Sequence, residues 1–392
     1  MATNALILDA LRTPTGRGRE GGALADVHPV DLLAQALTAL VERTGIDPGE
    51  VDDVLIGCVS QISEQSATPG RMAWLGAGFP AHVPATTIDR KCGSSQQAVH
   101  FAAQGIQAGA YDMVIAGGIE SMSRVPMGSA RAGADPYGQA VNARYAPGLV
   151  SQGVAAELVA AKYKISRTAQ DEYAVRSHRR AADAAEHFTR EIIPVTNGAG
   201  EVVSSDETVR PDSTVERLAG LKTVFETPEL SERFPEIEWS VTAGNASQIS
   251  DAASLVLLVS DRKARELGLE PRARVHEMTA VGDDPLLMLT GPIPATEKIL
   301  ARAQMSLEEI EHIEINEAFA PVPLAWQEHF CADFERVNPR GGAIALGHPL
   351  GASGTRLMTT MLHALEDNDQ RYGLQLMCEA GGMANATIIE RL

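Results

Sequence analysis

The sequence predicts an α/β fold built from two similar halves with a long insertion between them. Apolar runs of strand length alternate with segments of helical periodicity along most of the 392 residues. A short motif near the N-terminus returns near the C-terminus without gaps, which indicates an internal duplication. The composition, with 44% hydrophobic and 21% charged residues, is that of a soluble globular protein too long for one simple core.

The first half opens with alternating strand and helix signals. A strand is predicted over 5–9, and a helix with one apolar face over 29–45, which begins at a proline and ends at a glycine. Asp47 and Glu50 then have capping-box spacing and precede a short apolar strand over 54–56. This order of elements is typical of an α/β unit.

The duplication is predicted from two matches. Residues 45–57 align without gaps on 304–316. Both segments have a capping pair at the same spacing and apolar residues at the same positions. A second echo pairs the strand and Gly-rich turn of 113–118 with those of 377–382. Because the two matches occur in the same order, they predict two related α/β halves.

Residues 121–240 differ in composition and are predicted to form an insertion, or loop, domain. They begin with a stretch rich in Gly, Pro, Arg and Met, continue as a charged helical stretch over 154–187, and end polar and rich in turns. Such an excursion from a compact domain covers a binding site or serves as an oligomerisation arm. The predicted domains are an N-terminal half of 1–120 plus 241–268, the insertion of 121–240, and a C-terminal half of 269–392.

Charge and cysteine content argue against several functional classes. The chain has 33 Lys and Arg against 51 Asp and Glu, a net charge of −18, which argues against nucleic acid or an anionic membrane as a partner. No apolar run has the length of a membrane span, and the N-terminus lacks a signal-peptide pattern. The four cysteines are too far apart for a disulfide framework or a zinc site, so we expect no metal and a reducing, cytoplasmic setting.

Cys92 lies at a predicted strand-to-helix turn. A strand over 86–88 leads into the turn, and a helical pattern follows that stops at Gly109. The unpaired N–H groups and the dipole at a helix N-terminus favour an anion, so we expect the thiol to ionise more easily there. Small residues after it, beginning with Gly93, let a ligand approach the sulfur. The alternative is a buried cysteine that caps an ordinary helix.

Three further stretches concentrate unusual residues near strand ends. Asn316 opens the sequence Asn-Glu-Ala-Phe-Ala directly after a strand over 313–315. His348 lies in a Gly- and Pro-rich turn that opens a helix over 355–365, and Cys378 follows another strand. A structural histidine is the common case, but the glycines on both sides of His348 favour a functional role.

In order and spacing, these four stretches resemble the motifs of the thiolase family. The resemblance covers essentially the whole chain and includes 242–248, which is similar to the family's coenzyme A contact loop. It implies the thiolase fold, in which two duplicated α/β halves with mixed five-stranded sheets form αβαβα layers, with an insertion domain that covers the coenzyme A site. It also implies an acyltransferase with no bound cofactor, acyl-CoA and coenzyme A as substrates, and assembly as a homodimer or homotetramer.

The resemblance implies roles for five residues. Cys92 would be the nucleophile that carries the acyl group, His348 would accept its proton, and Cys378 would be the second acid/base. A water held by Asn316 would form one oxyanion hole with the His348 imidazole, and the backbone N–H groups of Cys92 and Ala380 would form the other. The implied reaction is thiolytic cleavage of a 3-ketoacyl-CoA, as in β-oxidation, or the reverse condensation of two acetyl-CoA molecules.

The same resemblance implies three coenzyme A contacts. Lys222 and Ser247 match positions similar to the family's contacts with the cofactor portion of the substrate. Phe319 would line the pantetheine tunnel. The alternatives are a solvated surface lysine at 222 and an ordinary core phenylalanine at 319.

The sequence departs from the family pattern in three places. Asp89 stands where the family usually has Asn, which raises the question of how the nucleophile loop is supported. Ala380 replaces a common Gly, so its N–H is kept only if the backbone suits alanine. The segment 151–153 reads Ser-Gln-Gly where short-chain thiolases tend to carry His-Met-Gly, which leaves the acyl preference open.

Two other functions are compatible with parts of this pattern. A decarboxylating β-ketoacyl synthase uses a histidine in place of the second reactive cysteine, so Cys378 argues against it. A non-catalytic acyl-CoA- or lipid-binding relative would have no reason to keep Cys92, His348 and Cys378 together. The Cys92 stretch and the C-terminal ending look most similar to actinobacterial degradative thiolases, including those that act on steroid side chains.

Overall fold

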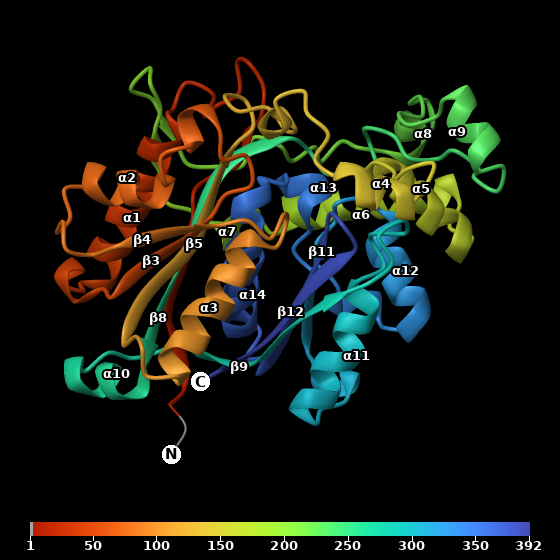
Figure 1. Ribbon diagram of the computed structural model, residues 1–392. Coiled ribbons are helices and arrows are strands. Elements are labelled where there is room, and N and C mark those ends of the chain that lie inside the picture. Colours follow the sequence, from red (N-terminus) through yellow and green to blue (C-terminus); the bar gives the residue numbers. More distant parts are fainter. Residues whose placement is uncertain (1–2) are drawn as a thin grey trace.

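A ten-stranded β-sheet in two parts, an N-terminal sheet and a C-terminal sheet, forms the frame of the molecule and has helices on both faces (Figure 1). The structure is a computed structural model that describes residues 3–392. The N-terminal sheet has the strand order β4-β3-β5-β8-β1, and the C-terminal sheet has the order β10-β11-β12-β9. The strands are β1 (Ala5–Arg12), β2 (Gly16–Arg17), β3 (Asp53–Gly57), β4 (Ala85–Ile88), β5 (Met113–Ser121), β6 (Val195–Thr196), β7 (Val202–Val203), β8 (Ser250–Ser260), β9 (Ala273–Gly282), β10 (His312–Ile315), β11 (Tyr372–Glu379) and β12 (Met383–Arg391).

The helices complete five layers in the order α, β, α, β, α, as predicted. Helices α3 and α14 lie between the two sheets, and their apolar faces share one buried cluster with strands of both halves (Figure 1). Helices α1 and α2 cover the other face of the N-terminal sheet, and α11 and α12 that of the C-terminal sheet. The helices are α1 (Pro29–Thr44), α2 (Pro69–Gly76), α3 (Ser94–Gln107), α4 (Gly138–Arg144), α5 (Gln152–Tyr163), α6 (Arg167–Asp183), α7 (Ala185–Phe188), α8 (Val215–Ala219), α9 (Pro228–Arg233), α10 (Asp261–Leu267), α11 (Pro292–Ala303), α12 (Pro321–Phe330), α13 (Ala343–Leu346) and α14 (Ser353–Asp367).

The C-terminal sheet has four strands where five were expected. The place of a fifth strand is taken by an isolated parallel bridge between Ile313 and Val337. The next residue, Asn338, adopts a φ of 44°, and this left-handed conformation ends the extended run after one residue. β1 and β9 pair antiparallel at Ile7 and Ala273, so hydrogen bonding continues from one sheet into the other.

The first predicted repeat is confirmed by the strand registers. β3 pairs parallel with β5 through Ile56 and Gly117, and β10 pairs parallel with β11 through Ile315 and Leu376. Since Ile56 matches Ile315 in the repeat, Gly117 corresponds to Leu376. Helices α3 and α14 begin at the same separation along the chain, so the halves correspond from strand to central helix.

The second predicted repeat is in the wrong register. The strand registers place Met113 opposite Tyr372 in the repeat, not opposite Met377. The error arises because the glycine pair of 117–118 and that of 381–382 have different structural roles. Gly118 lies inside β5, where an added Cβ would meet the carbonyl oxygen of Gly351 at 2.0 Å. The glycines after β11 form a turn, in which Gly382 has a φ of 72°.

The insertion contains α4 to α9 and the small β6–β7 hairpin. The single helical stretch predicted over 154–187 is wrong, because the chain forms α5, α6 and the short α7 there. Lys164 adopts a φ of 53° at the end of α5, and the Ser166 hydroxyl accepts a hydrogen bond from Ala169 N at 3.2 Å to cap α6. None of the helices within residues 3–392 is long and apolar enough to cross a membrane.

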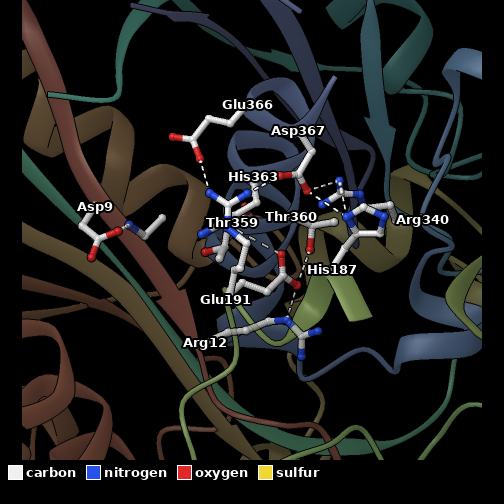
Figure 2. A network of polar contacts seen from close by, with 12 residues as sticks. Asp9, Arg12, His187, Glu191, Arg340, Thr359, Thr360, His363, Glu366 and Asp367 are labelled. Carbon is white, nitrogen blue, oxygen red and sulfur yellow. Dashed lines mark hydrogen bonds and ion pairs between the residues drawn. The ribbon is translucent and has the colours of Figure 1, made fainter. Parts of the chain in front are cut away.

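A buried polar network ties the insertion to both halves (Figure 2). Arg12 on β1 donates from Nε to Glu191 Oε1 at 2.7 Å, and the Thr360 hydroxyl on α14 donates to the same oxygen at 3.0 Å. His363 Nδ1, also on α14, lies 4.0 Å from the other carboxylate oxygen. The network thereby ties the C-terminal half of α14 to β1 and to the insertion.

Candidate active site

Cys92 lies in a tight turn between β4 and α3. Lys91 has a φ of 51°, and the Asp89 carboxylate accepts a hydrogen bond from Lys91 N at 2.8 Å and pairs with Lys91 Nζ at 2.6 Å. Asp89 therefore supports the nucleophile loop by closing its turn, the role left open by its departure from the family pattern. The Cys92 side chain itself is buried, at 3% exposure.

The expectation that Cys92 ionises easily is wrong for this structure. Burial is the main cause that raises the pKa of the Cys92 thiol to about 12, and a negative charge on the neighbouring Glu379 adds to the rise. Hydrogen bonds from Gln152 Nε2, at 4.0 Å, and from the backbone N–H groups of Cys92 and Ala380 oppose this rise without reversing it. Desolvation outweighs the helix dipole here, so the resting sulfur is a thiol and needs a base.

His348 lies in the turn that precedes α14, and its ring is held at both nitrogens. Nδ1 lies 2.6 Å from the Ser353 hydroxyl, which donates its own proton to Pro349 O at 2.9 Å. Nδ1 must therefore carry the ring proton, so Nε2 presents its lone pair, 3.3 Å from Asn316 Nδ2. Burial, with a smaller contribution from the Arg356 charge, lowers the pKa of His348 to about 3. The imidazole is neutral at rest.

Cys378 and Asn316 come together because β10 and β11 are parallel neighbours. Asn316 N donates to Leu376 O at 3.0 Å, which places the asparagine beside the end of β11. Burial and the nearby Cys92 sulfur raise the pKa of Cys378, while a hydrogen bond with the Asn316 side chain opposes the rise. The Asn316 amide therefore touches both His348 and Cys378, and its buried Oδ1 has no partner within residues 3–392.

Ala380 is accommodated in the turn after β11 without strain. The residues of that turn with left-handed backbone are Gly381, with a φ of 92°, and Gly382, with a φ of 72°. Since the glycines take the positive φ values, alanine is tolerated before them and keeps its N–H directed at the Cys92 sulfur.

Two of the residues expected to contact coenzyme A, Ser247 and Phe319, lie close to the end of β10 that carries Asn316. Ser247 N donates to Ala318 O at 2.9 Å, and Ala246 pairs with Phe319, so Ser247 and Phe319 are neighbours. Phe319 packs edge-on against Phe225 of the insertion, with ring centroids 6.1 Å apart. Lys222 lies on the adjoining loop with an exposed side chain.

Glu317 organises this region, although the sequence pattern did not predict it as a site residue. Its buried carboxylate accepts hydrogen bonds from the Tyr173 hydroxyl at 2.8 Å, the Ser177 hydroxyl at 2.7 Å, Asn338 Nδ2 at 2.9 Å and Ile344 N at 3.1 Å. It thereby joins α6 of the insertion to the strand end after β10 and to the chain before His348. Its place in the Asn-Glu-Ala-Phe motif was the only sequence signal, because partners so distant in the chain leave no local pattern.

The matches to known families cover almost the whole chain. The family model described as the thiolase N-terminal domain matches residues 5–262, and the thiolase C-terminal domain model matches residues 269–391. The chain belongs to the thiolase family. Among residues 3–392 of this thiolase, no group of three or more His, Cys, Asp or Glu side chains is arranged to hold a metal ion.

Individual relatives agree with this assignment. The steroid 3-ketoacyl-CoA thiolase FadA6 of Mycobacterium tuberculosis is 48% identical over 400 residues, which cover 100% of this chain and 95% of the relative. A 3-ketoacyl-CoA thiolase of Pseudoalteromonas translucida is 42% identical, with 99% of each chain covered. The crystal structure of the Bacillus anthracis acetyl-CoA acetyltransferase superposes with a TM-score of 0.89 at 37% identity, covering 100% of this chain and 99% of that one. The predicted family, fold class and acyltransferase class are confirmed.

Proposed function

We propose that this thiolase cleaves a 3-ketoacyl-CoA with coenzyme A, giving acetyl-CoA and a shortened acyl-CoA, through an acyl group carried by Cys92. The reverse reaction condenses two acetyl-CoA molecules. The observation that carries the proposal is the convergence of two buried cysteines, an uncharged imidazole and one amide that contacts the imidazole and the second cysteine. The names of the relatives, 3-ketoacyl-CoA thiolase and acetyl-CoA acetyltransferase, support the same chemistry.

In the first half-reaction, His348 takes the proton of Cys92 as the sulfur attacks the 3-keto carbon. His348 Nε2 carries the free lone pair, which suits it for this step. The N–H groups of Cys92 and Ala380 stabilise the oxyanion that forms on the attacked carbonyl. The bond between C2 and C3 then breaks, Cys378 gives its proton to the released C2 carbanion, and acetyl-CoA leaves.

In the second half-reaction, the Cys378 thiolate takes the proton of an incoming coenzyme A thiol. The coenzyme A sulfur attacks the acyl group on Cys92, and the Cys92 sulfur leaves and recovers its proton from His348. Asn316 contacts both His348 and Cys378, so a water held by its amide stabilises the enolate oxygen of the acetyl-CoA unit that the first half-reaction releases. Each proton returns to its starting group, and the cycle closes.

We assign the substrate to the degradative, lipid-derived class of 3-ketoacyl-CoA. Gln152 touches the nucleophile at the position where short-chain thiolases tend to carry Met, which supports an acyl group other than acetoacetyl. The relative with 48% identity is named as a steroid thiolase. The matched thiolase models and the placement of Cys378 beside Cys92 support this assignment over a decarboxylating synthase or a non-catalytic binding protein.

The coenzyme A portion would lie along the edge formed by Ser247, Phe319 and Lys222. Phe319 and Phe225 offer an apolar wall for pantetheine, and the exposed Lys222 ammonium suits a phosphate on an otherwise acidic protein. Coenzyme A is then a substrate, not a resident cofactor. We further propose a homodimer or homotetramer in the cytoplasm.

The experiment that tests the proposal separates the two half-reactions. Cys92→Ala should abolish covalent trapping of a labelled acetyl group from acetyl-CoA, while Cys378→Ala should keep that trapping and block thiolysis. Cys331→Ala, at the exposed free cysteine after α12, is the matched control and should behave as wild type. Trapping by Cys92→Ala at the wild-type rate, or equal loss of both half-reactions in Cys378→Ala, would contradict the assignment. A panel of acetoacetyl-, long-chain and bulky 3-ketoacyl-CoA substrates tests the substrate class, and a strong preference for acetoacetyl-CoA would overturn it.

A further inference from the structure

Glu379 is a buried carboxyl group beside the reacting sulfurs for which the proposed mechanism has no use. It lies between Cys378 and Ala380 in the chain and has no exposed surface. Neither of its side-chain oxygens has a hydrogen-bond partner within residues 3–392. A buried carboxylate without a donor is costly, so this position demands an explanation.

The N-terminal half has a glutamate at the corresponding position, and its carboxyl group is fully hydrogen-bonded. Glu120 occupies the corresponding position at the end of β5, by the strand registers that match Gly117 with Leu376. Its oxygens accept hydrogen bonds from Val59 N, Ser60 N, Gly351 N and Gln65 Nε2, at 2.9 to 3.2 Å. Glu120 therefore has the donors that an ionised group needs, whereas Glu379 has none of them.

The chain makes room for the Glu379 carboxyl directly against the nucleophile. A Cβ built on Gly93 would lie 1.8 Å from Glu379 Oε1 and 2.7 Å from its carboxyl carbon. Gly93 itself has an ordinary φ of −86°, so its backbone does not require a glycine. The missing side chain at Gly93 is needed for the close approach of Glu379.

The electrostatic surroundings favour the uncharged form of Glu379. Burial, together with the Asp89 carboxylate, raises the pKa of Glu379 to about 8, and only the Arg90 charge opposes the rise. In turn, a charge on Glu379 raises the pKa of both Cys92 and Cys378. The ionisable groups that interact with this carboxyl are thus the Asp89–Arg90 turn and the two cysteines.

We propose that Glu379 is a positioning residue whose uncharged carboxyl packs against Gly93, and whose loss of a proton to solvent places a negative charge that suppresses ionisation of both cysteines. When protonated, the Glu379 carboxyl group adds no charge that would raise the pKa of either thiol, and it completes the packing around the turn that carries Cys92. Deprotonated, it opposes formation of the Cys92 thiolate that attacks the substrate and of the Cys378 thiolate left by the first half-reaction. The proposal rests on the roles given above to Cys92 and Cys378. In alkaline solution, the ionised Glu379 would slow the steps that need either thiolate.

The test measures the ionisation of Cys92 without any substrate. The rate of Cys92 alkylation by iodoacetamide is followed from pH 6 to pH 10 in the full chain, with the modified residue identified by mass spectrometry. In the isosteric, uncharged variant Glu379→Gln, we expect alkylation at pH 9 about tenfold faster than in wild type, the effect of about one pKa unit on a thiol. Glu379→Asp keeps the charge and should remain close to wild type. Superimposable profiles of wild type and Glu379→Gln would overturn the proposal.

Wild type alone provides a second readout that does not depend on how the variants fold. A single thiol far below its pKa ionises tenfold more for each pH unit. If Glu379 loses its proton in the same range, the alkylation rate near pH 8 must rise less than tenfold for each pH unit. At higher pH, where Glu379 is fully ionised, the rate must again rise tenfold for each pH unit. A constant tenfold rise from pH 6 to pH 10 would overturn the proposal, whereas failure of the proposed function would show only in the acyl-trapping assays.

Discussion

The two central helices begin at corresponding positions of the repeat, yet the turns before them carry different chemistry. α3 begins at Ser94 and α14 at Ser353, positions that correspond in the repeat. Counted back from these, His348 occupies the place of Asp89, and Cys92 occupies the place of Gly351. Each half therefore supplies one member of the pair that we propose to react, a sulfur from the first turn and an imidazole from the second. The repeat thus provides the scaffold, and single residues that differ between the halves provide the function.

The carboxyl groups at the ends of β5 and β11 sharpen the same contrast. Glu120 uses its four donors to tie the loop after β3 to Gly351 in the turn before α14. Glu379 sits in the corresponding place against the turn before α3 and makes no hydrogen bond to a described residue. Burial raises the pKa of both groups, but four donors hold the carboxyl group of one half, whereas that of the other half lies without donors beside Cys92.

The largest expected effect comes from replacing His348, and the matched comparison is the same replacement at Asp89, its counterpart in the other turn. His348→Ala removes the base for a thiol whose pKa is raised to about 12, so we expect kcat to fall by about 10³- to 10⁴-fold. Asp89→Ala removes the carboxylate that closes the turn before Cys92 but no group that accepts the thiol proton, and kcat should fall less than about fivefold. Steady-state thiolysis with a 3-ketoacyl-CoA measures both. A comparable loss in the two variants would mean that the two turns do not differ in function.

Next in size is the effect of the two carboxyl groups on stability. Glu120→Gln leaves backbone donors facing an amide with a single acceptor oxygen, and we expect a loss of about 3 kcal/mol in the free energy of unfolding. Glu379→Gln removes a buried group without donors and should stabilise the protein by about 4 kcal/mol at pH 8, the free energy of a pKa shift from 4.5 to about 8. Urea unfolding of both variants and of wild type measures these changes.

The pH dependence of the Glu379→Gln effect follows from the raised pKa of about 8. A carboxyl group whose pKa is higher in the folded protein stabilises folding below its unfolded pKa, and this contribution is lost as pH rises toward 8. The glutamine variant does not titrate, so its advantage over wild type should vanish near pH 4.5 and grow up to about pH 8. An advantage that is the same at pH 5 and pH 8 would contradict an uncharged Glu379.

A smaller effect is expected at Gly93, whose counterpart in the repeat is Ala352. A methyl group at Gly93 collides with the Glu379 carboxyl, so Gly93→Ala should displace the turn and lower kcat about tenfold, or about 1.4 kcal/mol. Adding Glu379→Ala to Gly93→Ala makes room for the methyl group and should restore most of the activity. Failure of the double variant to recover would show that Gly93 is needed for another reason.

Sequence alone predicted the parts of the site that depend on local pattern. The turn before Cys92, the His348 turn and the strand ends at Asn316 and Cys378 were all found, because strand, glycine and helix signals are adjacent in the chain. The break at Lys164 was missed, since a non-glycine residue with positive φ leaves no compositional signal. The raised pKa of Cys92 could not be predicted either, because it results from burial among residues far away in the sequence.

The smallest expected effect concerns Gln152, which approaches the Cys92 sulfur from the insertion and has no counterpart in the repeat. Its Nε2 donates a weak hydrogen bond to Cys92 Sγ at 4.0 Å, which lowers the pKa of the thiol. Gln152→Met keeps the length of the side chain but removes the donor, so acylation of Cys92 should slow about threefold at fixed pH. Val154→Ala, two residues further on in α5, is the control for packing and should leave the acylation rate unchanged. If Gln152 also contacts the acyl group, the methionine variant should shift preference toward acetoacetyl-CoA, and an unchanged ratio of kcat/KM for acetoacetyl- and bulky 3-ketoacyl-CoA would limit its role to the sulfur.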